Sequence, residues 1–304
     1  MLIKSLLLTI SVLMGVAFLT LFEQKILSYS QSRKGPIKVG YKGMLQPFSD
    51  ALKLFFKEVA LPYMSNAYIY FFAPVLSLGV VLTVWLVYPS VMGVEEISLS
   101  IIFMMSCLGV GVYALLAAGW ASNSKFALLG GLRAVAQTIS YEVNFSLILL
   151  SFIVLMMSFD LEIFMVYSNS WLGFIALPLA TAWFISMLAE TSRTPFDFSE
   201  GESEIVSGFN TEFSSGPFAL FFLAEYGSIL FMSMLFSVIF LGGAEGSLYF
   251  YFKISSILFM FIWVRATLPR LRYDKLMDLS WVVILPISLS YLLFFVGLVS
   301  WFGV

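Results

Sequence analysis

Five stretches of this chain contain no aspartate, glutamate, lysine or arginine, and each is long enough to cross a lipid bilayer. They cover residues 59–94, 97–124, 163–189, 226–244 and 279–304. About 20 apolar residues span the hydrocarbon core as a helix, and a backbone in lipid must satisfy its own hydrogen bonds. The hydrophobic content is 61% and the charged content only 11%, too little polar surface for a soluble globule. We therefore predict an all-α polytopic membrane protein.

The apolar runs predict a single membrane domain over residues 1–304 with about eight transmembrane helices. These helices are expected at residues 2–22, 66–88, 98–120, 137–159, 171–189, 217–241, 248–264 and 281–302. The first run could be mistaken for a signal peptide, but it stays apolar to Phe22 and is interpreted as the first helix. No internal repeat indicates an inverted-repeat transporter.

Basic residues are concentrated in the connections after the first, third, fifth and seventh predicted helices. Fourteen of the sixteen fall there, and only Lys4 and Lys253 lie toward the other side. The positive-inside rule places these odd-numbered loops in the compartment of synthesis, either the bacterial cytoplasm or the mitochondrial matrix. The same loops also hold most of the acids. That mixture favours a docking surface or a chamber wall over a lipid anchor.

The first inner loop, residues 23–65, contains a segment with the spacing of an amphipathic helix. Its apolar side chains recur at helical intervals, at Phe48, Ala51, Leu52, Phe55 and Val59. We predict an amphipathic helix over residues 46–59, lying in the membrane interface. It is either a surface anchor or the border of a ligand passage or partner subunit.

A second inner loop, residues 190–216, is longer than a connection in a helical bundle needs. Its charged residues include Arg193, Asp197, Glu200, Glu202, Glu204 and Glu212. Carboxylates this close raise one another's pKa where water is restricted, which suits proton uptake and release. The alternative is a solvated acidic loop, and Ser199 with Glu202 also fits a capping box at the start of a short helix.

Three further carboxylates, Glu142, Glu190 and Glu225, lie inside predicted crossings or at their ends. A charge near mid-bilayer costs about 2.5 to 3.5 kcal/mol on insertion scales, so such residues face protein or water. At ~1.5 Å per residue, Glu142 lies roughly 13 Å beyond Arg133, and Glu225 roughly 12 Å beyond Pro217. This matched depth suggests a descending relay from the loop acids through Glu190. The alternative is that they pair with Arg133 or tyrosine hydroxyls only to fix packing.

Two basic clusters surround prolines at the same face. Their members are Arg33, Lys34 and Lys38 in the first, and Arg265, Arg270, Arg272 and Lys275 in the second. Such charges set topology, touch anionic lipid, or form an ordered platform for a soluble partner.

Residues that bind redox metals are scarce in this chain. It has one cysteine, Cys107, and no histidine, so it lacks the usual ligands of haem, zinc and iron–sulfur clusters. No phosphate-cradling glycine loop or hydrolase elbow is present. Any redox cofactor is therefore expected in a partner.

Several long motifs carry a resemblance that runs nearly end to end. They are QSRKGPIKVGYKGMLQPFSDALKLFFKE (31–58), ALLGGLRAVAQTISYEV (127–143), AETSRTPFDFSEGESEIVSGFNTEFS (189–214), AEYGSILFMSMLF (224–236) and WVRATLPRLRYDKLM (263–277). With these motifs the chain resembles subunit 1 of the mitochondrial proton-pumping NADH:ubiquinone oxidoreductase, respiratory complex I. The resemblance implies that the chain forms the membrane part of the quinone-binding chamber and couples quinone reduction to proton translocation.

The resemblance also implies roles for individual residues. It assigns to the quinone chamber Lys25, Phe48, Asp50, Phe55, Arg193, Phe196, Asp197, Glu200, Glu202, Glu204, Glu212, Phe213 and Arg272. It assigns to the proton path Glu142, Glu190, Glu225 and Tyr226. Two positions depart from the family pattern, because Gln24 replaces an arginine and Phe213 a tyrosine. We assign Gln24 no role.

The resemblance further implies a subunit without a redox centre, inactive as an isolated chain. Ubiquinone is the expected substrate, while flavin and iron–sulfur clusters reside in partner subunits. The expected partners are hydrophilic-arm subunits at the quinone site, small and antiporter-like membrane subunits, and lipids, with no nucleic acid or metal. The expected location is the mitochondrial inner membrane, multi-pass, with the odd-numbered loops in the matrix. The alternatives are a stand-alone ion or solute transporter and a subunit of a membrane-bound hydrogenase.

Overall fold

The computed structural model describes residues 2–89, 97–167, 173, 176–198, 201, 207–242 and 247–302, and within these ranges every regular element is a helix. The predicted all-α fold is confirmed. In chain order the elements are α1 (Leu2–Ser30), η1 (Tyr41–Gly43), α2 (Gln46–Phe56), α3 (Ala67–Val84), η2 (Trp85–Val87), α4 (Ser100–Ala121), α5 (Lys125–Met156), α6 (Leu161–Tyr167), α8 (Leu177–Glu190), η3 (Gly208–Glu212), α10 (Ser215–Phe240), α11 (Leu248–Thr267), α12 (Tyr273–Asp278), η4 (Leu279–Ile284) and α13 (Leu285–Phe302).

Seven helical stretches of the described chain are long and apolar enough to cross a membrane. They are Ile3–Ser30, Ala67–Val87, Ser100–Ala121, Lys125–Met156, Ser215–Phe240, Leu248–Thr267 and Tyr273–Trp301. Each contains or overlaps one predicted crossing. The remaining prediction, residues 171–189, corresponds to the shorter apolar helix α8, and several residues at its start lie outside the described ranges.

Two of these helices extend further than the apolar runs suggested. α1 continues to residue 30 instead of 22, and α5 begins at Lys125 instead of residue 137. The runs measure only the part that fills the hydrocarbon, whereas a helix continues until a cap ends it. At the start of α5 the Ser124 hydroxyl accepts a hydrogen bond from the Ala127 N–H. Arg133 therefore lies in a helix and not in a loop. The helix predicted over residues 46–59 is confirmed as α2, which ends three residues earlier, at Phe56.

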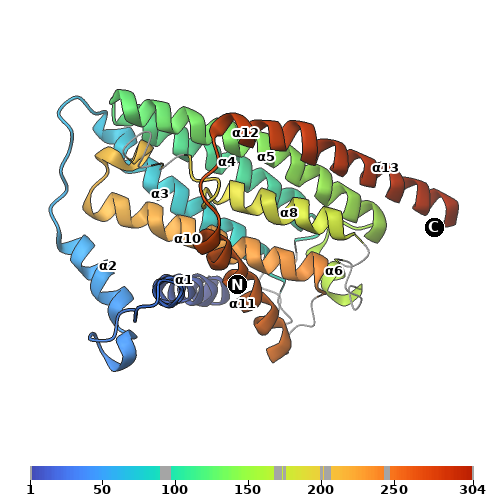
Figure 1. Cartoon of the computed structure of the whole chain (residues 1–304), viewed down its shortest axis with the longest axis horizontal. Coiled ribbons are helices and arrows are strands. Elements are labelled where there is room, and N and C mark those ends of the chain that lie inside the picture. Colours follow the sequence, from blue (N-terminus) through green and yellow to red (C-terminus); the bar gives the residue numbers. More distant parts are fainter. Residues whose placement is uncertain are drawn as a thin grey trace.

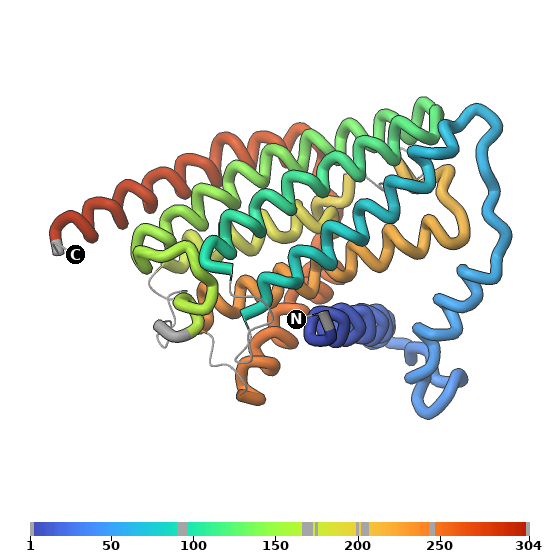
Figure 2. The backbone as a smooth tube through the Cα atoms, turned by 180° about the vertical axis from the view of Figure 1, so that it is seen from behind, coloured from blue at the N-terminus to red at the C-terminus, as the bar shows by residue number. Residues whose placement is uncertain are grey.

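Most of the helices run side by side, while α1 crosses them steeply. Figure 1 shows α3, α10, α8, α5 and α13 extending along the long axis and α1 nearly end-on, and Figure 2 shows the same arrangement from behind. The start of α3 meets the end of α4, where the Asn66 N–H donates to the Ala121 carbonyl at 3.0 Å. We call this end, which also holds the start of α10, the basic end. α6 and the end of α10 lie at the opposite end.

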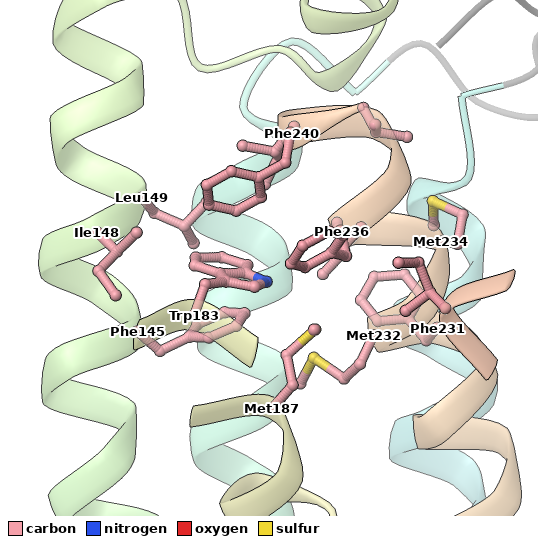
Figure 3. Close-up of a cluster of buried hydrophobic side chains, with 14 of the residues drawn as sticks. Phe145, Ile148, Leu149, Trp183, Met187, Phe231, Met232, Met234, Phe236 and Phe240 are labelled. Atoms are coloured by element: carbon pink, nitrogen blue, oxygen red, sulfur yellow. The ribbon is translucent and has the colours of Figure 1, made fainter. Parts of the chain in front are cut away.

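A cluster of buried aromatic rings fixes α8 within the bundle (Figure 3). The Trp183 ring stacks on Phe145 of α5 with centroids 4.0 Å apart and lies 5.8 Å from Phe240 of α10. Lipid tails are as apolar as these rings, so van der Waals packing, and not exclusion from water, holds membrane helices together. This packing sets the position of Glu190 at the end of α8.

Glycines bring α4, α5 and η3 into close contact. A Cβ atom on Gly119 of α4 would lie 3.1 Å from the Cα of Gly131 on α5. On the preceding residue of α5, Gly130, a Cβ would lie only 2.7 Å from the Cα of Gly208. Small residues allow membrane helices to approach in this way. As a result η3 lies directly on α5, with Phe209 buried beside it.

Candidate functional site

Charged side chains from α1, α10, α11 and the loop after α8 meet near the basic end. Arg193 lies between two carboxylates, with Nη1 3.9 Å from Glu23 Oε1 and Nη2 3.9 Å from Glu225 Oε2. Arg265 of α11 also donates to Glu23. The Arg193 guanidinium lies over the Tyr226 ring, 4.4 Å from its centroid. These five residues form what we call the charge cluster.

The charge cluster is balanced in charge, with two carboxylates and two guanidiniums, and its centre is buried. The side chains of Glu23 and Arg193 are only 9% and 13% exposed, whereas those of Glu225 and Arg265 are 22% and 35% exposed. Buried charges of this kind persist only when they are paired. A cavity of about 20 Å³, large enough for one water molecule, adjoins Glu23, Arg193 and Arg265. Because Arg193 lies equally far from both carboxylates, a small displacement changes its preferred partner.

The loop that carries Arg193 is held by a buried amide. Gln137 of α5 is fully buried, and its Nε2 donates to the carbonyls of Ala189 and Phe196 at 2.8 Å each. Further along, Arg270 pairs with Asp197 at 3.1 Å. These contacts join the loop to α5, to the end of α8 and to the segment after α11. The predicted chamber residues Phe196 and Asp197 therefore contribute to the position of Arg193.

A cavity of about 260 Å³ lies between α1, α2 and α10, and we call it the α1–α2 cavity. Its polar lining includes Gln24, Asp50 and Tyr226, and Phe55 is among its apolar residues. Phe48, also predicted for the chamber, packs its ring edge-on against a phenylalanine of α1. A mostly apolar hollow with a few polar groups is typical of a small-molecule site.

A second cavity, of about 120 Å³, lies between α3, α4, α5, α8 and α10, and we call it the acidic cavity. Glu190 and Glu225 both line it. Glu142 of α5 points toward α4, where a Cβ on Gly109 would lie 3.2 Å from its Oε1, and it is close enough to Glu190 for direct electrostatic interaction. The structure thus brings together the three carboxylates singled out in the sequence.

Two successive residues of α10 connect the cavities through the charge cluster. Tyr226 lines the α1–α2 cavity and Glu225 lines the acidic cavity. Both contact Arg193. A change of charge near Tyr226 can therefore affect Glu225 through the side chain of Arg193 alone.

Other predicted site residues lie apart from this arrangement. Lys25 donates to the Lys42 carbonyl at 2.9 Å and fixes the loop before α2. Arg272 pairs with Asp274 at 3.0 Å on the exposed surface.

The end of the acidic loop has its own contacts, with α3. Phe213 is buried and stacks on Tyr70 with centroids 4.4 Å apart. The Tyr70 hydroxyl donates to the Glu212 carbonyl at 2.8 Å. The remaining acids of this loop, Glu200, Glu202 and Glu204, and the proposed cap Ser199, lie outside the described residues.

Sequence reasoning did not identify Glu23 as a site residue and placed Arg265 only in a surface cluster. Glu23 directly follows an apolar run, which is the same signal that drew attention to Glu190. Its pairing with Arg265 joins residues 242 positions apart and follows from the packing of α1 on α11. Within the described chain, no group of cysteine, aspartate and glutamate side chains is arranged to hold a metal ion.

Comparison with known proteins finds relatives along nearly the whole chain. The sequence model described as NADH dehydrogenase matches residues 3–296. The chain belongs to this family. NADH-ubiquinone oxidoreductase chain 1 of Anopheles gambiae is 59% identical over 302 residues, covering 99% of this chain and 96% of that protein. The chain 1 proteins of Locusta migratoria and Sarcophilus harrisii are 56% and 48% identical, covering 96% and 97% of this chain and 94% and 96% of their own lengths. The resemblance seen in the motifs is confirmed.

Proposed function

We propose that this chain is the membrane subunit of proton-pumping NADH:ubiquinone oxidoreductase that lines the quinone chamber and passes the energy of quinone reduction to a proton path. Its family and the names of its relatives support the coarser statement, that it is a membrane subunit of this oxidoreductase. The observation that carries the finer proposal is the pair Tyr226 and Glu225, which joins two cavities through Arg193.

The α1–α2 cavity is suited to a quinone that arrives from the membrane. Its apolar walls accept an isoprenoid tail, and its polar groups can hydrogen-bond to the carbonyl oxygens of the head group. Asp50 and Phe55 of α2 and Tyr226 of α10 lie on facing sides of this space. Electrons come from flavin and iron–sulfur clusters in partner subunits, while this chain positions the quinone and responds to its charge.

Arg193 is the coupling element. Reduction of a quinone to a quinol takes two electrons and two protons, so negative charge precedes or accompanies proton uptake. Negative charge near Tyr226 attracts the Arg193 guanidinium, which loosens its 3.9 Å contact with Glu225. A carboxylate that loses its cation binds a proton more readily. Glu225 then takes up a proton within the acidic cavity, beside Glu190 and near Glu142.

The basic end is the surface on which the hydrophilic arm docks. Most basic residues of the chain are on this side, and Arg33, Lys34 and Lys38 are exposed. By the positive-inside rule this end faces the mitochondrial matrix. The antiporter-like subunits continue the proton path from the acidic cavity.

The test is to change Glu142 or Glu225 to glutamine in the assembled enzyme. Both substitutions keep the size of the side chain but remove its titration, so NADH:quinone turnover and proton pumping should fall. Glu162→Gln, an exposed position on α6 at the opposite end, is the matched control and should leave both unchanged. NADH oxidation by a water-soluble acceptor should be normal in all three variants. Full pumping in both Glu142→Gln and Glu225→Gln would exclude the relay.

The transporter alternative makes a different prediction. The purified chain alone in liposomes would then carry ions or solutes down a gradient. We expect no such transport, because the proposed reaction needs electrons from the partner subunits.

A further inference from the structure

α10 forms the wall between the α1–α2 cavity and the acidic cavity. From Phe218 to Tyr226 one face of this helix lines the α1–α2 cavity, and from Phe221 to Met232 another face lines the acidic cavity. No described residue lines both cavities. α1 packs against α10 on the first side and α3 on the second (Figures 1 and 2). The separation of the two cavities therefore depends on how these three helices meet.

The three helices meet at Gly227, which directly follows Glu225 and Tyr226. A Cβ built on Gly227 would lie 2.8 Å from Val81 Cγ1 of α3 and 3.8 Å from Val16 Cγ2 of α1. Carbon atoms prefer about 3.5 to 4.0 Å, so a side chain at this position would push Val81 away. Val16, which is only 1% exposed, lines the α1–α2 cavity, and Val81 lines the acidic cavity. We call Val16, Gly227 and Val81 the valine contact.

The backbone at the valine contact is also closed to water. Nε1 of Trp85, one helical turn after Val81, donates to the Gly227 carbonyl at 3.2 Å. A carbonyl oxygen has two lone pairs, of which the α-helix uses one and the indole uses the other. The Trp85 ring packs edge-on against Phe231, with centroids 5.6 Å apart. A buried water needs two to four polar partners, and two valines with an occupied carbonyl offer it none.

The proposed coupling requires a barrier to protons at this place. In that coupling Arg193 transmits a change of charge between the cavities, but a guanidinium stays protonated in proteins and carries no proton across. If water joined the cavities directly, a proton taken up by Glu225 would return to the reduced quinone. The quinol would then form without sending a proton into the path.

We propose that the valine contact, held in place by Trp85, is a seal that keeps protons of the acidic cavity from returning to the quinone. The proposal rests on the function proposed above and adds residues that carry no charge and no proton. A weakened seal separates electron transfer from pumping, so fewer protons are pumped for each NADH oxidised. A substitution that only damages the fold lowers pumping and turnover in proportion and leaves this ratio unchanged.

The experiment measures the protons pumped per NADH by the assembled complex in liposomes. Val81→Ser and Val16→Ser shorten the side chain and add a hydroxyl to which water can hydrogen-bond, so each should lower the ratio. Trp85→Phe keeps an aromatic ring but frees the carbonyl, and should lower the ratio less. Val75→Ser is the matched control, because Val75 is an exposed residue of the same helix as Val81, and it should leave the ratio unchanged.

Two further measurements separate the seal from other defects. NADH oxidation by a soluble acceptor should be normal in every variant, which shows that the complex is assembled. Without NADH, liposomes with each variant should hold an imposed proton gradient equally long, because the seal separates two spaces inside the chain. Should Val81→Ser fail to assemble, Val16→Ser and Trp85→Phe decide by the same ratio.

Three results would overturn the proposal. One is an unchanged ratio in both Val81→Ser and Val16→Ser, which includes a proportionate loss of pumping and turnover. Another is an equal fall of the ratio in Val75→Ser. The third is faster decay of the imposed gradient in the two seal variants, which would indicate a leak across the membrane. If Glu225→Gln pumps fully, the relay itself fails. If Glu225→Gln does not pump while both seal variants keep the full ratio, the relay stands and only the seal is wrong.

Discussion

Replacing Gly130 by alanine should displace η3 from α5 and weaken the quinone-linked reaction. The added Cβ would lie 2.7 Å from Gly208 Cα and 2.9 Å from both Gly208 C and Phe209 N. Carbon atoms prefer about 3.5 to 4.0 Å, and backbone atoms cannot rotate away, so η3 must shift by about 1 Å. Overpacking costs about 1–3 kcal/mol, and alanine gains about 1 kcal/mol over glycine in a helix. Because the added Cβ collides with three backbone atoms, the upper end of the overpacking cost applies, and the free energy of unfolding should fall by about 2 kcal/mol overall.

Gly79→Ala in α3 is the matched control, because no heavy atom lies within 4 Å of a Cβ built there. It gains the same helix propensity without the collision. The assay is the temperature at which the assembled complex loses NADH:quinone activity, together with quinone turnover. Gly130→Ala should lower both, since Phe209 lines the acidic cavity, while NADH oxidation by a soluble acceptor stays normal. Equal inactivation temperatures in Gly130→Ala and Gly79→Ala would refute the reasoning.

Two further substitutions test charged groups. Arg193→Met removes the cation that lies between Glu23 and Glu225, while Glu23 keeps its contact with Arg265. Assembly of the complex on native gels should therefore fall, and adding Glu225→Gln should restore part of it. No rescue would show that the 3.9 Å contact between Arg193 and Glu225 carries little energy. Lys253→Met removes the donor to the Leu241 and Gly242 carbonyls and should speed hydrogen exchange at the end of α10. Lys253→Arg keeps a donor and should preserve the protection. Unchanged exchange in the methionine variant would contradict this role.

The membrane topology could be predicted because lipid permits few solutions. A charge-free run of about 20 residues has to form a helix there, and the predicted crossing at 66–88 differs from Ala67–Val87 by one residue at each end. The start of α5 was harder to predict. Gly130 and Arg133 extend that helix beyond the hydrocarbon, where hydropathy no longer marks it and only the cap at Ser124 does.

The site could be predicted in part. Glu142, Glu190 and Glu225 are visible in the sequence because a carboxylate is costly in an apolar run. Their grouping with Arg193 and Glu23 is not, because it depends on how α1 crosses the bundle. A run of apolar residues with no strong amphipathic pattern does not say which of its faces meets a neighbour.

α1 packs on α10 between two separate spaces. At this contact a Cβ on Gly15 would lie 3.5 Å from Leu230 Cδ1, and a Cβ on Gly227 would lie 3.8 Å from Val16 Cγ2. The α1–α2 cavity lies on one side, and an open space of about 680 Å³ between α1, α10 and α11 lies on the other. The two spaces share no lining residue, yet α1 forms a wall of both. A change in the tilt of α1 that widens the α1–α2 cavity would therefore also reshape the space on the far side of the contact.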